Sequence, residues 1–349
     1  MSEGATPALG QFLRRMGLES IAGFSYESPI SGGGTNFTAL FRRESQKAVA
    51  KFFFMGPHAI TLKKFRNELD NHQRSRLISN VLPEIYEEFQ SQDCFLRGYL
   101  MEYIEGESLE SLIPSAGFGE TSELHAAFYR VTWAYHGPFL AQVHGDLHPG
   151  NILFETNMAD WLARRPESPE VRILDLGASI SPYKFAYEET FDEDLWADHQ
   201  RRFGGSFYSL APEFLTEGYT RAMQMPGQLD CWSLGLLLYK MTTGKLLHVA
   251  DSLGSYAACI NNGRLQHKLD VTIDQSVSGY HLNALLKWML RVDAADRINL
   301  TTATDYMARL YRNDEDLLGK QGKALREFVA HGCDPEWHLP PHERSNSPY

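Results

Sequence analysis

The feature of this sequence that most constrains its fold is a change in the spacing of apolar residues near Gly106. Before that point, residues 37–43, 48–54 and 95–103 are apolar runs of strand length separated by turn residues. After it, apolar residues recur every three to four positions, as in the stretch 122–142, which is typical of helices. Strands followed by helices indicate the α+β class. The sequence therefore predicts two lobes, a small β-rich lobe followed by a large α-helical lobe.

Helical patterns are also present near both ends of the chain. Apolar residues at helical spacing predict a helix over residues 6–16, which either packs on the small lobe or docks a regulatory partner. The same spacing predicts later helices over 281–291, 301–312 and 320–331, and prolines after residue 334 indicate an irregular tail. We therefore expect four segments: an N-terminal helical extension (1–24), the small lobe (25–104), the large lobe (105–318), and a C-terminal helix with an irregular tail (319–349).

The composition is that of an average globular protein and excludes several classes. Hydrophobic residues make up 43% and charged residues 22% of the 349 residues, which excludes wholesale disorder and coiled coils. The net charge of −11 disfavours a nucleic-acid partner, because phosphate binding needs clustered positive charge. The four cysteines form no C-x-x-C pair, so no zinc site is visible and a reducing compartment is indicated. Without a signal peptide or a long apolar run, we expect a cytoplasmic protein with no membrane span.

The segment with the most chemical meaning spans residues 144–151 and reads His-Gly-Asp-Leu-His-Pro-Gly-Asn, which has the form H-x-D-L-x-x-x-N. Twenty-four residues after it, Asp175 begins an Asp-Leu-Gly triplet at the end of an apolar strand. Upstream, Lys51 ends a strand and Glu68 lies on the next predicted helix. Each piece alone has an ordinary explanation: a solvated charge, a turn or a capped loop. All four in this order, each on the expected type of element, make a chance match remote.

At these residues the chain resembles the eukaryotic-type Ser/Thr protein kinase family, over about residues 25–312. The resemblance implies a bilobal kinase fold and the use of ATP with Mg²⁺. It implies that Lys51 binds the α- and β-phosphates and that Glu68 holds Lys51. It also implies that Asn151 and Asp175 ligate Mg²⁺ and that Asp146 accepts the proton of the substrate hydroxyl. Because a transferring phosphoryl group needs mainly positioning and neutralisation, charged and oxygen-bearing side chains suit this chemistry.

The resemblance also implies where the nucleotide would lie. A phosphate-binding loop is expected between two strands, where the backbone comes close through Gly32, Gly33 and Gly34. The spacing of these glycines departs from the family pattern, and a plain triple-glycine hairpin is the alternative. The segment after Tyr99 is similar to the hinge between kinase lobes. There Met101 would lie beside the adenine, and the backbone of Glu102 and Ile104 would pair with its edge.

Three motifs in the second half resemble the substrate-binding lobe of protein kinases. They are Ala-Pro-Glu ending at Glu213, the segment starting at Asp230, and the turn that ends at Arg297. The resemblance implies a buried ion pair between Glu213 and Arg297. The catalytic-loop wording itself is closer to aminoglycoside and choline kinases, so a small-molecule phosphotransferase is one alternative. A pseudokinase that binds nucleotide as a scaffold is the other, and the complete set of charged residues argues against it.

Several positions depart from the family pattern or refine it. Gly145 stands where the family has an arginine, which argues against switching by a phosphorylated activation segment. Ser206 favours transfer to Ser or Thr. Six acidic residues between 188 and 198 favour a basic protein substrate, although a solvated loop is as good an explanation. The sequence thus predicts a protein kinase that transfers the γ-phosphate of Mg-ATP to Ser or Thr of a protein, with a regulatory partner as an option.

Overall fold

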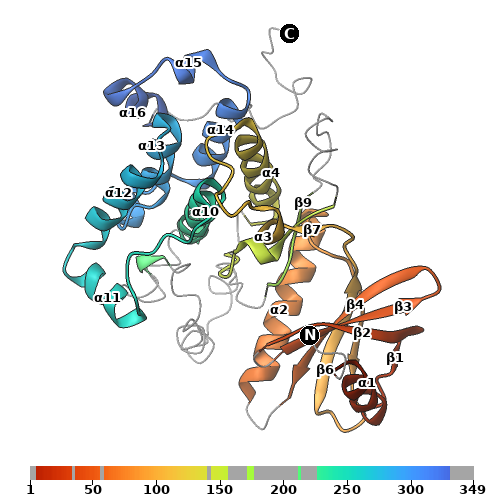
Figure 1. Cartoon of the computed structure of the whole chain (residues 1–349). Helices are drawn as coiled ribbons and strands as arrows, with labels where there is room; N and C mark the ends of the chain where they lie inside the picture. The colour runs from red at the N-terminus through yellow and green to blue at the C-terminus, as the bar shows by residue number, and fades with distance from the viewer. Residues whose placement is uncertain are drawn as a thin grey trace.

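The computed structural model describes residues 5–33, 36–55, 59–139, 143–155, 171–176, 211–213 and 226–330. Within them, a twisted antiparallel sheet with two helices forms one part of the molecule, and a group of helices forms the other (Figure 1). The chain passes from the first part to the second after strand β6. The fold is therefore the α+β arrangement predicted from the sequence, a small strand-rich lobe followed by a large helical lobe.

The small lobe is built on a six-stranded antiparallel sheet in the order β1-β2-β3-β4-β6-β5. Strand β5 has no counterpart in the sequence analysis, because Glu87 and Glu88 interrupt its apolar pattern and because it pairs on one side only, at the edge of the sheet. The strands are β1 (Ser20–Ile21), β2 (Phe24–Gly33), β3 (Asn36–Arg43), β4 (Gln46–Phe54), β5 (Ile85–Gln90) and β6 (Leu96–Glu102).

Two helices cover opposite faces of this sheet. Successive side chains of a strand point to opposite faces, and on β4 these are Phe52 and Phe53. Helix α1 (Ala5–Arg15) inserts the fully buried Leu13 into the cluster around Phe52. Helix α2 (Ala59–Ile78) packs Phe65 and Leu69 against Phe53. The predicted N-terminal helix therefore uses its apolar face within its own lobe, and α2 is placed against the strand that carries Lys51.

A three-stranded sheet lies where the two lobes meet. Its strands are β7 (Glu107–Ser108), β8 (Ile152–Phe154) and β9 (Val171–Ile173), in that order. Strand β8 directly follows the H-x-D-L-x-x-x-N segment, and β9 ends two residues before Asp175. Because Ile152 pairs with Ile173, the sheet brings these two motifs side by side although they are distant in the sequence.

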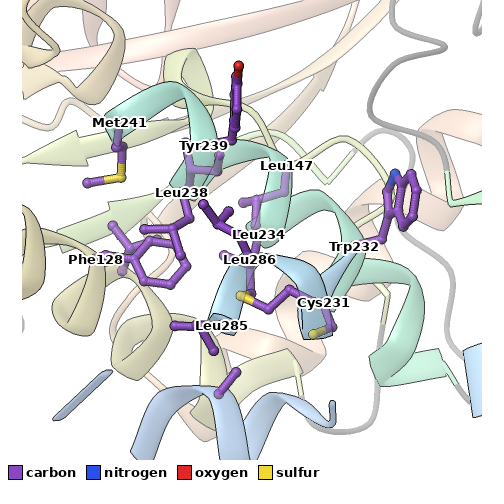
Figure 2. Packing of buried hydrophobic residues seen from close by; sticks show 14 of the residues in the cluster. Phe128, Leu147, Cys231, Trp232, Leu234, Leu238, Tyr239, Met241, Leu285 and Leu286 are labelled. Atoms are coloured by element: carbon purple, nitrogen blue, oxygen red, sulfur yellow. The ribbon is translucent and has the colours of Figure 1, made fainter. Parts of the chain in front are cut away.

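The large lobe is organised around helix α10, which is apolar on nearly all sides, as the sequence indicates. Figure 2 shows Leu234 and Leu238 of α10 packed with Phe128 and with Leu285 and Leu286, which come from two other helices. The elements are α3 (Leu109–Leu112), α4 (Ser122–Phe139), η1 (Pro149–Asn151), α10 (Pro226–Thr243), α11 (Leu253–Asn261), α12 (Leu265–Ser276), α13 (Tyr280–Met289), η3 (Ala294–Asp296), α14 (Leu300–Tyr311), α15 (Glu315–Leu318) and α16 (Gly322–Ala330).

The helices expected over 281–291, 301–312 and 320–331 are present as α13, α14 and α16, with ends within two residues. Helices α11 and α12 have no counterpart in the sequence analysis, although Leu265, Leu269 and Ile273 of α12 recur every four residues. In the part of the chain that the structure describes, no helix has the length and apolar character needed to cross a bilayer. The irregular tail expected after residue 334 lies outside the described residues.

The two lobes share more than the connecting chain. Val81 and Leu82, which lie between α2 and β5, are buried in the core of the large lobe. The backbone N–H of Ile173 donates to the carbonyl oxygen of Val81 at 3.0 Å. The guanidinium of Arg172 on β9 donates to the carboxylate of Glu102 at the end of β6. This arrangement fixes the loop after α2 to the sheet that adjoins the H-x-D-L-x-x-x-N segment and Asp175.

Candidate active site

The centre of the site is a buried ion pair between β4 and α2. The Lys51 ammonium lies 2.5 Å from Oε1 of Glu68, and both side chains are almost completely buried. Lys51 points toward α2 because it lies on the same face of β4 as Phe53, two residues further along the strand, and its Nζ lies 5.5 Å from the centroid of the Phe53 ring. The structure thus brings together the lysine and the glutamate that the sequence analysis singled out.

A third residue, which the sequence analysis did not single out, contacts the same carboxylate. The hydroxyl of Tyr99 on β6 donates to Oε1 of Glu68 at 2.5 Å, and Tyr99 is buried. Tyr99 is the cross-strand partner of Lys51 in the β4–β6 pair. One oxygen of Glu68 therefore accepts hydrogen bonds from two donors on neighbouring strands. An aromatic residue within an apolar strand gives no sign of this contact in the sequence.

Asp175 brings the large lobe to the same lysine. Its Oδ1 lies 2.7 Å from Lys51 Nζ, while its side chain keeps 43% of its surface exposed. Asp175 has a left-handed backbone conformation, with φ of 60°, which aspartate tolerates better than most residues. Lys51 therefore joins a buried carboxylate on one side and a solvent-facing carboxylate on the other.

Burial and charge act in opposite directions on these groups. Burial alone would lower the pKa of Lys51, but the carboxylates of Asp175 and Glu68 more than offset this and raise it above its ordinary value. Burial raises the pKa of Glu68, while Lys51 and the Tyr99 hydroxyl lower it. Lys51 is therefore a fixed positive charge at neutral pH, and it faces the side of the site where Asp175 is exposed.

The backbone at the start of the H-x-D-L-x-x-x-N segment is held by Asp230, near the start of α10. The backbone N–H groups of His144 and Gly145 donate to the two oxygens of Asp230, at 2.7 and 3.3 Å, and the hydroxyl of Tyr135 donates to the same carboxylate. Gly145 adopts a φ of 78°, a conformation that glycine reaches without strain. Burial raises the pKa of Asp230 to about 6. This buried acid shapes the loop that presents Asp146.

His144 ties this loop to the strand before Asp175. One ring nitrogen, Nδ1, accepts from the backbone N–H of Asp146 at 3.3 Å, so the other, Nε2, carries the proton and donates to the carbonyl oxygen of Leu174 at 3.0 Å. Burial lowers the pKa of His144 to about 4, so the ring is neutral at neutral pH. A neutral imidazole that makes two hydrogen bonds thus links the backbone of Asp146 to that of Leu174, the residue before Asp175.

Asp146 and Asn151 lie on the two sides of the short turn that ends the loop. The side-chain Nδ2 of Asn151 donates to the backbone carbonyl oxygen of Asp146 at 3.0 Å, which directs the Asn151 oxygen the other way. Burial raises the pKa of Asp146 above its ordinary value, and Asp175 adds to this effect while His148 and Lys51 oppose it. A carboxylate with a raised pKa and partial exposure is suited to accept a proton.

The remaining residues of the predicted nucleotide site lie where strands end. Gly32 and Gly33 close strand β2, and Gly33 pairs with Asn36 at the start of β3. Gly34 lies outside the described residues. The backbone is therefore a hairpin at the predicted position, which is compatible with both interpretations of the glycines, a phosphate loop and a plain turn.

The predicted hinge follows β6. Met101 is the cross-strand partner of Val49 and packs against the cluster that contains Phe53 and Tyr99. The backbone N–H of Glu102 donates to Glu84 at 2.8 Å, so a contact from Glu102 to a base would come from its carbonyl oxygen. Ile104 is buried just beyond the strand. The three residues lie on one short segment between the lobes, as the sequence analysis expects.

A second buried ion pair supports the large lobe. The guanidinium of Arg297 donates from Nη1 and Nη2 to the two oxygens of Glu213, at 2.6 and 2.9 Å. The pair implied by the resemblance is therefore present, and it is bidentate. Other predictions fall on positions that the structure does not describe: Ser206, Gly177 and the acidic residues between 188 and 198 lie outside the described residues.

The donor set at the centre fits Mg²⁺. Asp175 offers a partly exposed carboxylate, and Asn151 an amide oxygen directed away from its own loop. Mg²⁺ favours a few such oxygen ligands, with water and phosphate oxygens filling the other positions. These two residues would hold the ion, as the sequence analysis expects.

A family model described as "Protein kinase domain" matches residues 31–308. The match covers most of the chain and includes the residues of the site described above. The chain therefore belongs to the protein kinase family.

Individual relatives agree with this assignment. The chain is 30% identical over 154 residues to a Mycoplasma genitalium protein that carries a serine/threonine-protein kinase name, covering 42% of this chain and 36% of that protein. It is 30% identical over 188 residues to mouse sperm motility kinase 2A, covering 54% and 31%. It is 27% identical over 207 residues to Arabidopsis thaliana calcium-dependent protein kinase 29, covering 58% and 32%. The chain thus spans about a third of the length of the curated relatives it matches.

Proposed function

We propose that this protein transfers the γ-phosphate of ATP, with Mg²⁺, to a Ser or Thr hydroxyl of a protein substrate. The observation that supports it most is the convergence on Lys51 of Glu68 from the small lobe and Asp175 from the large lobe. Such a fixed positive charge between an anchoring carboxylate and a metal-binding carboxylate suits a polyphosphate ligand. The Mycoplasma genitalium relative, which is named as a serine/threonine-protein kinase, favours Ser or Thr over Tyr.

Each residue would contribute one elementary task. Lys51 would neutralise phosphate charge, and Glu68 would hold its ammonium in place. Asn151 and Asp175 would hold Mg²⁺, which when bound offsets charge on the phosphate oxygens. Asp146 would orient the attacking hydroxyl and accept its proton, and its raised pKa favours that transfer. Burial of the Lys51 pair strengthens these electrostatic effects, since little water screens them.

The substrate and location are proposed on the sequence alone. Acidic residues between 188 and 198 favour a basic protein as the substrate, because opposite charge steers encounter. Neutralising them should lower kcat/KM for a basic peptide, because the attraction between opposite charges is lost, and an unchanged kcat/KM for that peptide would contradict the idea. A cytoplasmic location, the absence of nucleic-acid and membrane partners, and a regulatory partner stay predictions.

Mass spectrometry of a basic protein incubated with Mg-ATP and the purified chain tests the proposal directly. We expect phosphate on Ser or Thr with the wild type and none with Asp146→Asn. Asp251→Asn is the matched control, because Asp251 is an almost fully exposed aspartate of the large lobe, and it should behave as the wild type. Phosphate in a metabolite extract but in no protein would favour the small-molecule alternative. Nucleotide binding without consumption in either setting would favour a pseudokinase.

A further inference from the structure

The strongest unexplained feature of the site is the environment of Tyr99. Its ring lies against one face of α2: the centroid is 6.5 Å from that of Phe65 and 6.2 Å from that of His72. Between these two residues on the same face lies Glu68, which accepts the Tyr99 hydroxyl at 2.5 Å. Residues three and four apart on a helix share one side, so Tyr99 contacts α2 over about two turns.

Removing the Tyr99 hydroxyl would leave Glu68 without one of its two hydrogen-bond donors. Tyr99 and Glu68 are both buried, so water does not replace the hydrogen bond freely. A hydrogen bond to a carboxylate is about twice as strong as one between neutral groups. The contact also joins a rigid strand to a helix, because Tyr99 and Lys51 are paired residues of adjacent strands.

The ion pair alone does not determine where α2 lies. Lys51 contacts Asp175 at 2.7 Å as well as Glu68, so its charge keeps a partner if α2 moves away. Tyr99 differs from Lys51 in this respect, because its hydroxyl donates to Glu68 and its ring packs on α2. Of the two donors to Glu68, Tyr99 is therefore the one that depends on the helix.

We propose that Tyr99 is a positioning residue, which holds Glu68 and thereby α2 in the place where Lys51 is paired, without a docked partner. The idea rests on the proposed function for its consequence in catalysis. It agrees with Gly145, which lacks the arginine that a phosphorylated activation segment would engage. Holding α2 from within the sheet makes such an external signal unnecessary for this element.

Hydrogen exchange of the nucleotide-free protein tests the structural part. Tyr99→Phe removes one oxygen and keeps the ring, and we expect backbone amides of α2 to exchange about tenfold faster, with α4 unchanged. The matched control is Tyr86→Phe on β5, whose hydroxyl bonds to Gln46 and not to α2, and which should leave α2 as in the wild type. Equal α2 exchange in the wild type and Tyr99→Phe would overturn the proposal.

A double-mutant cycle tests the catalytic part. Tyr99→Phe should lower kcat/KM about tenfold, with a higher KM for ATP, whereas the same change in a Glu68→Gln background should have almost no further effect. A loss of equal size in both backgrounds would show that Tyr99 acts on stability alone and would reject the positioning role. An inactive wild type would overturn the kinase proposal, and the exchange experiment would still decide the role of Tyr99.

Discussion

The two lobes each contain a buried ion pair, and the pairs differ in how completely their donors are used. Arg297 donates to both oxygens of Glu213 and also to the backbone carbonyl oxygens of Gln228 and Arg291. Lys51 contacts one oxygen of Glu68 and shares its charge with Asp175, which faces solvent. The Arg297 guanidinium is thus held by several acceptors within the core, while the Lys51 ammonium has one buried acceptor and one acceptor that faces solvent.

This difference follows from the residue types and separates support from function. A planar guanidinium matches a carboxylate in two places at once, which suits a permanent link between segments. An ammonium is a compact charge that three acceptors can approach from different directions, which suits a residue that must also meet phosphate. We therefore expect the large-lobe pair to determine stability and the small-lobe pair to determine activity.

The largest effect on stability is expected from Arg297→Met. It leaves Glu213 buried without its two donors, so the free energy of unfolding should fall by about 3–5 kcal/mol. Urea denaturation measures this. Arg291→Met is the control, since Arg291 is 4.0 Å from Asp270 at the surface and should change stability by less than about 1 kcal/mol. Similar losses of unfolding free energy for Arg297→Met and Arg291→Met would contradict a special role of the Glu213–Arg297 pair in stability.

Acid should weaken both lobes through one buried neutral histidine in each. Burial lowers the pKa of His72 on α2 and of His144 in the catalytic loop to about 4, below the ordinary 6.5. The stability that depends on these neutral rings is fully present above pH 6.5. It is lost as the pH falls toward 4, because the histidines of the unfolded chain are protonated at a higher pH than those of the folded chain. Each contributes up to about 3 kcal/mol. In urea denaturation, the free energy of unfolding of His72→Gln and of His144→Gln should fall less between pH 7 and pH 4.5 than that of the wild type. The same pH dependence in the variants and the wild type would count against this.

Lys51→Met should remove activity but cost less stability than Arg297→Met. Glu68 keeps the Tyr99 hydroxyl as a donor, so we expect a loss of about 1–3 kcal/mol at pH 7. Burial already raises the pKa of Glu68, and without Lys51 it rises further, so the folded variant takes up a proton as the pH falls. The penalty relative to the wild type should therefore shrink from pH 7 to pH 5.5 in urea denaturation. A constant penalty as large as that of Arg297→Met would contradict this.

The smallest effect concerns a third buried carboxylate, Asp230, which is held by neutral donors. One donor is the N–H of Gly145, whose φ of 78° suits glycine. Gly145→Ala should cost about 1 kcal/mol of stability, because a Cβ strains this conformation. Gly227→Ala, with no atom within 4 Å of the added Cβ, should cost nothing measurable in the same thermal denaturation. A Gly145→Ala variant as stable as the wild type would show that the loop accommodates the added Cβ.

The sequence predicted on which kinds of element the candidate site residues lie, because their motifs follow one another in a recognisable order. Lys51, Glu68, Asp146, Asn151 and Asp175 stand on the expected strands, helix and loops, and the Glu213–Arg297 pair is present. It did not predict Tyr99, because a tyrosine in an apolar strand differs little from its neighbours until the register with Lys51 is known. The edge strand β5 was missed for a similar reason, since its stability comes from pairing with β6 rather than from its own composition.

The shared core around Val81 and Leu82 has a consequence for how the molecule unfolds and how it could be recombined. These residues belong to the small-lobe half of the sequence but are buried with the large lobe, and Arg172 reaches back to Glu102. A cut in the chain near residue 105 would therefore expose apolar surface and unpaired backbone on both fragments. The two lobes should melt in a single cooperative step, and exchanging one lobe with that of a relative would require carrying the loop between α2 and β5 along with the large lobe.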